Sequence, residues 1–421
     1  MSPRPAASRW RCAGVALLWA IGCASSAWSQ PSGAATDFPA QASAPAAPRP
    51  SDALIHQAQI EARILRPPRI VHGSDGQRHL AYELRITGFQ ANDDPLTLVR
   101  VTVFSRGGTA PLAMVEGAGI EALLSQQAPE GESLDGVPIA AGRSKTLFFW
   151  LTLPPGNLPS FLRHQLVFRT GKGETAQADN VDTTILAAAP IRIGPPLRGG
   201  RWLAVEGPGN HRSHHWGGLV AIDGKLTIPQ RFAIDWFGLD DGNHSVRGAH
   251  DSLAATVDAD WFGYGHQVLA VADGVVVDAR DGIPNGQPLT PQETPDDLTA
   301  RTLYGNFVIL RIAPDTYVHY AHLQKGTLAA KIGQKVRRGD VLGRLGQTGA
   351  AGAPHLHFHV SDRPTFEQSE GLPYLIDAFV LLGRGTLGDT FDPARRVDLL
   401  ESQVGPRHSE LPLDGSVVMF P

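Results

Sequence analysis

Apolar and polar residues alternate along several short runs of the chain, and a period of two residues is typical of half-buried antiparallel strands. Long stretches with helical periodicity are scarce, whereas glycine and proline are abundant, with 46 and 33 residues. In the first half of the chain, four strand-like runs lie between turn-forming residues: 80–86, 96–104, 146–153 and 164–169. The pattern therefore predicts a mainly β protein, in which residues 55–195 form an immunoglobulin-like β-sandwich.

A second series of strand signals predicts a separate antiparallel β domain over residues 205–385. In its last strand, His355, His357 and His359 alternate with apolar residues. An extended strand places these three imidazoles on one face and the apolar side chains on the other. The preceding runs of this domain are residues 267–277, which contain the turn pair Asp273-Gly274, and residues 304–312, 317–323 and 336–346.

The segments between and after the two domains show weaker patterns. Residues 190–200 contain three prolines and three glycines, and we expect them to form the joint between the domains. Residues 386–421 show no clear periodicity, and we expect an irregular tail there.

The start of the chain indicates export. A basic beginning, an apolar run over residues 13–22 and small residues up to Ala27 predict a signal peptide over residues 1–27. The apolar run is shorter than the about 20 residues that span a bilayer. Residues 28–52 are rich in alanine and proline and predict a disordered tether. We therefore expect a periplasmic or otherwise envelope-associated protein.

The chain has two cysteines, Cys12 and Cys23, and both lie in the predicted signal peptide. A chain cleaved after Ala27 has no disulfide, so a metal site would have to consist of histidines and carboxylates. Cys23 also weakly matches a bacterial lipoprotein site, which leaves a lipid anchor at Cys23 as an alternative.

Composition narrows the choice of partners. The chain has 37 basic and 41 acidic residues and a net charge of −4, which gives no indication of a nucleic acid or an anionic membrane surface as partner. No later stretch is apolar enough to predict a membrane span. The first domain has no cluster of catalytic residue types, so its expected role is support or binding of a partner protein.

Histidines concentrate in the second half, where 11 of the 16 fall between His211 and His359. They occur among motifs in a fixed order. These are residues 263–276, Tyr304-Gly305-Asn306, residues 320–323 (Tyr-Ala-His-Leu), Gly339 with Gly343, and residues 354–358 (Pro-His-Leu-His-Phe). The ordered set resembles the LytM/lysostaphin family of zinc metallopeptidases over about residues 211–362.

This resemblance implies an antiparallel β fold with an open groove and hydrolysis of peptide bonds in bacterial cell-wall peptidoglycan. It also implies that Asp235 and His357 bind Zn²⁺, and that His322 and His355 are catalytic. The residue types suit this chemistry. Zinc held by three nitrogen or oxygen ligands keeps a position for water and lowers the pKa of that water towards 7. A neighbouring histidine can then accept a proton or stabilise the oxyanion.

One departure from the family pattern concerns the third zinc ligand. The family places a histidine four residues before the aspartate, where this chain has Arg231, and a protonated guanidinium cannot bind zinc. A hairpin around Asp223-Gly224, with residue 222 opposite residue 225, would place residue 212 opposite Asp235 and bring residues 213–215 towards it. We hypothesise that His215 replaces the missing ligand, with His214 or His211 as alternatives. A second departure is His359, where the family commonly has glutamate, and the sequence assigns it no role.

The sequence thus predicts a zinc-dependent metalloendopeptidase that hydrolyses peptidoglycan peptides by zinc-activated water with two catalytic histidines. One alternative is an inactive LytM-like domain that binds cell wall or regulates a cell-wall hydrolase. Another is a zinc peptidase that acts on proteins.

Overall fold

The computed structural model describes residues 56–91, 94–125, 135–248, 255–290, 297–385, 396–400 and 403–421. These described residues belong to one compact unit. The chain is nearly all β with antiparallel sheets, which confirms the predicted fold class. The predicted signal peptide, the tether and both cysteines lie outside the described residues. No helix in the described part of the chain is long and apolar enough to cross a membrane.

The first half of the chain folds into two antiparallel sheets. The four-stranded sheet contains β1 (Ile60–Ile64), β2 (Ile70–His72), β3 (Arg78–Gly88) and β7 (Ser144–Leu153). The five-stranded sheet contains β4 (Leu96–Ser105), β5 (Pro111–Glu116), β6 (Val137–Ile139), β8 (Phe161–Arg169) and β9 (Thr175–Thr184). The short helix α1 (Ala118–Glu121) follows β5. Each of the four predicted runs lies in a strand of one of these sheets.

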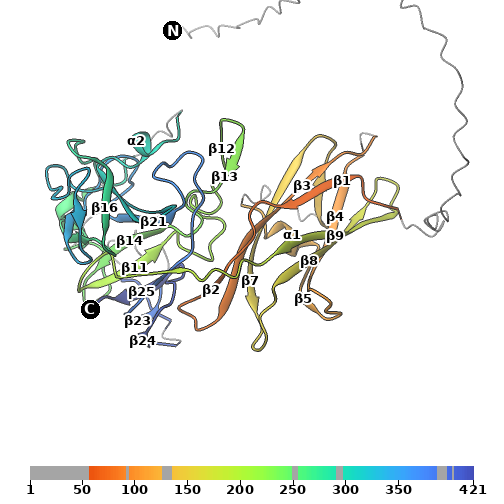
Figure 1. Cartoon of the computed structure of the whole chain (residues 1–421), viewed down its shortest axis with the longest axis horizontal. Coiled ribbons are helices and arrows are strands. Elements are labelled where there is room, and N and C mark those ends of the chain that lie inside the picture. The colour runs from red at the N-terminus through yellow and green to blue at the C-terminus, as the bar shows by residue number, and fades with distance from the viewer. Residues whose placement is uncertain are drawn as a thin grey trace, which may run out of the picture. The chain divides into compact units, whose positions relative to one another are not determined.

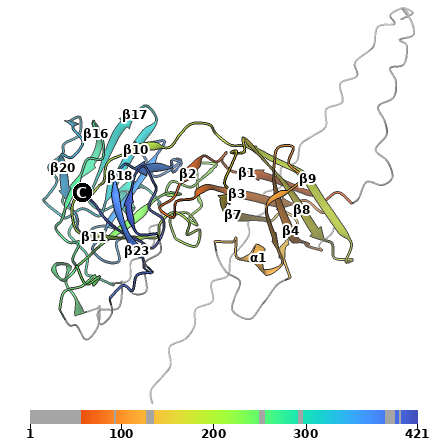
Figure 2. The same ribbon diagram turned by 90° about the horizontal axis from the view of Figure 1, so that it is seen from below.

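Both sheets contribute side chains to one hydrophobic cluster, because alternate residues of their strands point the same way. Leu80 and Leu84 of β3 meet Val101 of β4 and Leu166 of β8 in this cluster. Figure 2 shows β1, β3 and β7 on one side and β4, β8 and β9 on the other. The immunoglobulin-like connectivity remains a prediction.

A buried histidine links the two sheets of this first half. Nδ1 of His164 on β8 lies 2.8 Å from the carbonyl oxygen of Val181 and donates a hydrogen bond to it. Its Nε2 lies 3.0 Å from the hydroxyl of Tyr82 on β3. Burial lowers the pKa of His164 to about 4, although the bond to Val181 acts in the opposite direction. The ring is therefore neutral in the folded protein at neutral pH.

We expect His164 to make the protein less stable in acid. Its folded-state pKa lies below the unfolded value of about 6.5, so the unfolded chain binds the proton more strongly. Stability is then fully present above pH 6.5 and falls by about 3 kcal/mol as the pH decreases towards 4. Urea unfolding of wild type and His164→Gln at pH 7, 5.5 and 4 measures this loss. The difference in free energy of unfolding between wild type and His164→Gln should shrink as the pH falls.

A matched control is His56→Gln, because His56 lies exposed in the same domain. This variant should follow the pH profile of wild type. A stability difference between wild type and His164→Gln that stays constant from pH 7 to 4 would contradict the expectation.

The second half is built on a ten-stranded sheet in the order β19-β16-β17-β18-β21-β14-β11-β25-β23-β24. Figure 1 labels β16, β21, β14, β11, β25, β23 and β24 of this sheet. In chain order the strands are β11 (Arg201–Val205), β14 (Ile234–Leu239), β16 (Gly274–Arg280), β17 (Phe307–Ala313), β18 (Thr316–Ala321), β19 (Lys335–Val336), β21 (Leu356–Ser361), β23 (Phe379–Arg384), β24 (Gly405–Arg407) and β25 (Ser416–Met419). Neighbouring strands run antiparallel.

In the described part of this half there are also three small sheets and two short helices. The sheets pair β10 (Ile191–Ile193) with β22 (Tyr374–Ile376), β12 (Val220–Ile222) with β13 (Lys225–Thr227), and β15 (Gln267–Leu269) with β20 (Val341–Arg344). The helices are η2 (Asp258–Asp260) and α2 (Ala300–Leu303).

In its described part, residues 396–400 and 403–421, the predicted irregular tail instead contains two strands, β24 and β25. β25 lies between β11 and β23 in the large sheet, and Val417 and Val418 are fully buried. The apolar run of β25 was too short to stand out in the sequence. Its position depends on pairing with β11, more than 200 residues earlier, as shown by Leu203 opposite Val417. The expected joint at residues 190–200 also contains a strand, β10, which pairs in parallel with β22.

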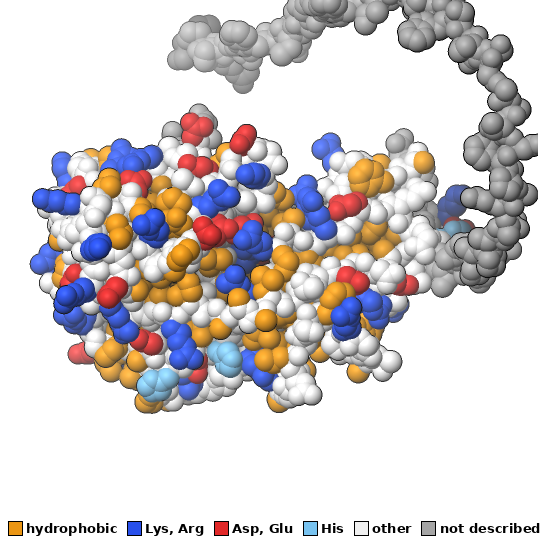
Figure 3. Space-filling model, in the orientation of Figure 1, with side chains coloured by type: hydrophobic (Ala, Val, Ile, Leu, Met, Phe, Trp, Pro, Cys, Tyr) orange, Lys and Arg blue, Asp and Glu red, His pale blue; other side chains and the backbone are white. Residues whose placement is uncertain are grey.

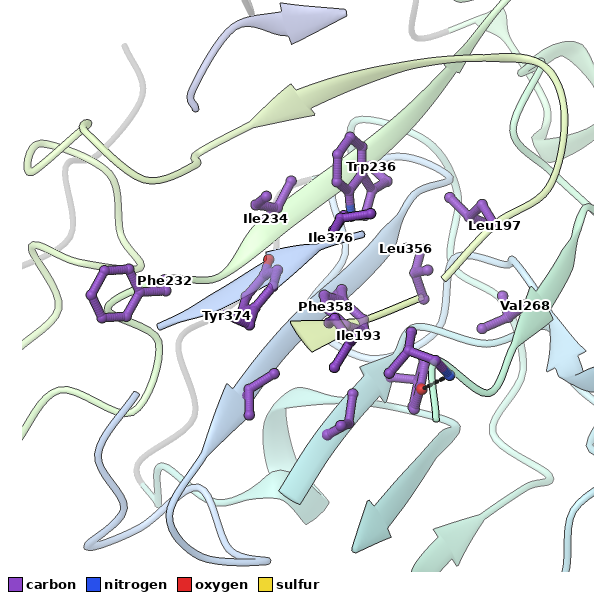
Figure 4. Packing of buried hydrophobic residues seen from close by; sticks show 14 of the residues in the cluster. Ile193, Leu197, Phe232, Ile234, Trp236, Val268, Leu356, Phe358, Tyr374 and Ile376 are labelled. Atoms are coloured by element: carbon purple, nitrogen blue, oxygen red, sulfur yellow. Dashed lines mark hydrogen bonds between the residues drawn. The ribbon is translucent and has the colours of Figure 1, made fainter. Parts of the chain in front are cut away.

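One face of the large sheet packs on a hydrophobic core drawn from both halves of the chain. Figure 4 shows Ile234 and Trp236 of β14 together with Leu356 and Phe358 of β21 in this core. The cluster also includes Ala81 of β3, so β3 contributes alternate residues to two cores. The sandwich-like sheets are therefore packed directly on the second half.

On the face shown in Figure 3, basic and acidic side chains are interspersed.

Candidate metal centre

The candidate site lies on the opposite side of β14 and β21 from the core. Because side chains alternate along a strand, burial of Ile234 and Leu356 in the core directs Asp235 and His357 to the other face. The two residues are direct partners in the antiparallel pair of β14 and β21. On its other edge, β21 pairs with β18, and His322 follows the end of β18.

Three imidazoles converge on one oxygen of Asp235. The distance from its Oδ1 is 2.9 Å to Nδ1 of His357, 3.4 Å to Nε2 of His355 and 3.5 Å to Nε2 of His215. All four side chains are buried. Although burial by itself would raise the pKa of Asp235, His355 and His215 hold this pKa well below its ordinary value. Asp235 is therefore a carboxylate at neutral pH.

His215 presents a lone pair to this carboxylate. Its Nδ1 lies 2.9 Å from the carbonyl oxygen of Glu206 and donates to it, so the neutral ring carries its proton on Nδ1. Burial lowers the pKa of His215 well below its ordinary value. Among the described residues, its Nε2 has no hydrogen-bond partner. A buried lone pair that faces a carboxylate oxygen is unfavourable unless a cation lies between them, and these donor types suit Zn²⁺.

His214 lies next to this group but in a different environment. The potential ligand atoms of His214, His215 and Asp235 lie within 4.8 Å of one another. However, the side chain of His214 is 68% exposed and lies 3.4 Å from Glu206. Burial opposes the charged form, but Glu206 raises the pKa of His214 above its ordinary value. Because His214 is largely exposed and paired with Glu206, whereas His215 is buried with Nε2 facing Asp235, His215 is the better candidate.

His211, the third histidine proposed at this position, lies against the first half of the chain. Its Nε2 is 2.6 Å from the carbonyl oxygen of Ala122. The structure therefore places this ring nitrogen in a hydrogen bond rather than beside Asp235.

The route by which His215 reaches Asp235 differs from the prediction. The hairpin of β12 and β13 forms with Ile222 opposite Lys225, as expected, but it ends after three residue pairs. The partner of Asp235 on the remaining side is Val205 of β11, not residue 212. His215 is instead supplied by residues 206–219, which connect β11 to β12. We call this segment the ligand loop.

Arg231 does not face Asp235. Its Nε and Nη2 lie 2.8 and 2.9 Å from the two carboxylate oxygens of Glu83 on β3, and its Nη1 lies 2.8 Å from Glu370. All three side chains are buried. Burial by itself would lower the pKa of Arg231, but the two carboxylates raise it above its ordinary value. At the position where the family has a zinc ligand, this chain has a buried ion pair.

His322 and His355 are oriented alike at the edge of the site. The Nδ1 of His322 lies 2.7 Å from the carbonyl oxygen of Thr348, and that of His355 lies 2.7 Å from the carbonyl oxygen of Ala353. Both rings donate through Nδ1, so proton exchange would take place at Nε2, which in His355 also faces Oδ1 of Asp235. The ring centroids are 4.7 Å apart. Burial lowers the pKa of His322 well below its ordinary value.

No role was predicted for the residues behind His357. Its Nε2 lies 2.9 Å from Nδ1 of His359 and 3.0 Å from the side-chain nitrogen of Gln230. The hydroxyl of Tyr304 lies 3.4 Å from Nε2 of His359. Contacts of this kind fix the orientation of a metal-binding histidine. The alternation along β21 was a signal for His359, whereas Gln230 had none.

Comparisons with known proteins identify the second half. Residues 259–368 match Peptidase family M23, so the chain contains a LytM-type peptidase domain, as the sequence motifs predicted. This family is one of zinc metallopeptidases. The matched segment contains His322, His355 and His357, whereas His215 and Asp235 lie before it.

Three proteins illustrate the similarity. The chain is 31% identical over 101 residues, 24% of its length, to cell division protein DipM of Caulobacter vibrioides. It is 37% identical over 71 residues, 16% of its length, to peptidoglycan DD-endopeptidase ShyA of Vibrio cholerae. The matches span 13% and 16% of those relatives. The solved catalytic domain of lysostaphin from Staphylococcus simulans is 19% identical, with a TM-score of 0.19, and the match covers 38% of this chain and 79% of that one.

Proposed function

We propose that the protein is an exported zinc-dependent metalloendopeptidase that hydrolyses peptide bonds in bacterial cell-wall peptidoglycan. The observation that carries this proposal is the convergence of His215, His355 and His357 on Oδ1 of Asp235, where Nε2 of His215 finds no hydrogen-bond partner among the described residues. The M23 domain and the relative named as a peptidoglycan endopeptidase support the substrate class. The names of the relatives also support a location in the cell envelope.

In this proposal, His215, Asp235 and His357 hold the metal. When bound, zinc would act as a Lewis acid that polarises the scissile carbonyl and lowers the pKa of a water molecule at the site. His322 and His355, whose Nδ1 protons are held by backbone carbonyls, use Nε2 to accept a proton from water and to donate one to the oxyanion or leaving amine. Burial keeps His322 neutral and able to act as a base.

A second candidate function is a non-catalytic LytM-like domain that binds cell wall or regulates a hydrolase. Arg231 favours it, because this residue replaces the usual ligand. The burial of four metal-site and catalytic histidines around Asp235 favours the enzyme, since a binding surface requires no such cluster.

Zinc content and peptidoglycan digestion separate the two functions. Purified protein without its signal peptide should contain about one zinc per chain and release peptides from purified peptidoglycan. His357→Ala should lose the zinc. His322→Ala should keep the zinc but digest about 10²- to 10⁴-fold more slowly, because the proton transfer is impaired. Peptide release is measured by chromatography. A parent protein that takes up no zinc after supplementation would support the non-catalytic function instead.

A further inference from the structure

The ligand loop is attached to the first half of the chain. Trp216, the neighbour of His215, donates from Nε1 to a carboxylate oxygen of Glu83 on β3, over 2.6 Å. Its ring also packs edge-to-face on Phe148 and Trp150 of β7, with centroids 5.9 Å apart in each case. These contacts, and that of His211 with Ala122, place the loop against the sandwich-like sheets.

Glu83 uses both carboxylate oxygens in this arrangement. One oxygen accepts from Arg231 Nε and from Trp216 Nε1, and the other accepts from Arg231 Nη2. Glu83 is fully buried. A bidentate ion pair between arginine and a carboxylate has a fixed geometry, so the Glu83 oxygen that accepts from Trp216 is held in place.

His215 precedes Trp216 directly in the chain, so the position of Trp216 also fixes the backbone position of His215. The backbone N–H of Trp216 donates to the hydroxyl of Ser213, and that of Gly217 to the carbonyl oxygen of Ser213, which closes a tight turn around His215. On the far side of the turn, His215 donates to Glu206. A shift of Trp216 would therefore move Nε2 of His215 relative to Asp235.

We propose that Glu83 is a positioning residue of the metal centre and that, through Trp216, it makes the first half of the chain a part of that centre. This inference rests on the proposed function, in which His215 is a zinc ligand. It connects the missing ligand at position 231 with its proposed replacement by His215. Arg231 takes the usual ligand position and binds Glu83, and Glu83 holds the loop that supplies the replacement ligand.

The test measures zinc affinity of the mature protein by competition with a chelator. Glu83→Gln removes the ion pair, and Trp216→Phe removes the donor while keeping the aromatic packing. Each is expected to weaken zinc binding about tenfold or more, as loss of a contact behind a metal ligand does. Since both variants break the same link, the double variant should bind zinc about as weakly as the weaker single one.

Glu370→Gln is the matched control. Glu370 is also a buried partner of Arg231 at 2.8 Å, and no hydrogen bond to Trp216 is found for it in the described chain. It should therefore change zinc affinity less than about threefold. Near-ultraviolet circular dichroism of the zinc-free proteins checks the fold. If Glu83→Gln does not fold, Trp216→Phe decides, because it leaves the ion pair intact.

Two results would overturn the role of Glu83 while leaving the proposed function intact. These are unchanged affinity in Trp216→Phe, or an equal loss in Glu370→Gln and Glu83→Gln. Failure of the proposed function looks different, because wild type then binds no zinc or His215→Ala binds it as tightly as wild type.

Discussion

Replacing His215 with alanine is expected to remove zinc from the protein and to reduce peptidoglycan hydrolysis to background. His215 Nε2 lies 3.5 Å from Asp235 and carries a lone pair, because Nδ1 donates its proton to Glu206. Without this ring, the site keeps only Asp235 and His357 as ligands, and two protein ligands rarely hold zinc. Metal analysis of the dialysed protein and a digestion assay measure the two losses.

The neighbour His214 provides the control for this prediction. His214→Ala also removes an imidazole from the ligand loop, but the His214 ring is largely exposed and is paired with Glu206. It should retain about one zinc per chain. Loss of zinc in His214→Ala with retention in His215→Ala would assign the ligand to His214. Retention in both variants would refute the hypothesis that either histidine replaces the ligand missing at position 231.

Replacing Arg231 with methionine is expected to lower the free energy of unfolding by about 3–5 kcal/mol. The variant leaves the carboxylates of Glu83 and Glu370 buried without their cation. The cost comes mainly from these uncompensated charges rather than from the lost attraction, since an intact buried ion pair contributes little net stability. Urea unfolding at pH 7, followed by tryptophan fluorescence, measures the change.

An exposed ion pair in the first half provides the comparison. Arg100 and Glu116 lie 3.3 Å apart with side chains that are 42% and 54% exposed. Arg100→Met should cost no more than about 1 kcal/mol, because water solvates the remaining carboxylate. Adding Glu83→Gln and Glu370→Gln to Arg231→Met should recover part of the loss, as the buried charges disappear. A loss below about 1 kcal/mol in Arg231→Met would contradict the expectation.

Much of the candidate site could be predicted because it depends on local pattern. The alternation along residues 355–360 placed His357 on the face opposite Phe358, and the structure has the same arrangement in β21. The motif order indicated a LytM-type peptidase domain, which the match to Peptidase family M23 confirms. The roles assigned to Asp235, His322, His355 and His357 remain proposals, although the structure brings these residues together.

The parts that could not be predicted depend on pairing between distant segments. β25 carries too short an apolar run to be recognised, and its place in the sheet follows from pairing with β11. The hairpin of β12 and β13 had the expected register but ended too early to bring residue 212 opposite Asp235. Local turn chemistry fixes where a hairpin begins, whereas tertiary packing decides how far it extends.

By itself, the sequence determined the β class of the protein, the faces of the strand that carries His355 and His357, and the absence of a usable ligand at Arg231. Only the tertiary structure decided what Arg231 does and where His215 lies. Arg231 binds Glu83, which is 148 positions away along the chain, and Glu83 in turn holds Trp216 beside His215. A buried charge takes its partner from whatever segment the fold brings next to it, and sequence spacing carries no information about that segment.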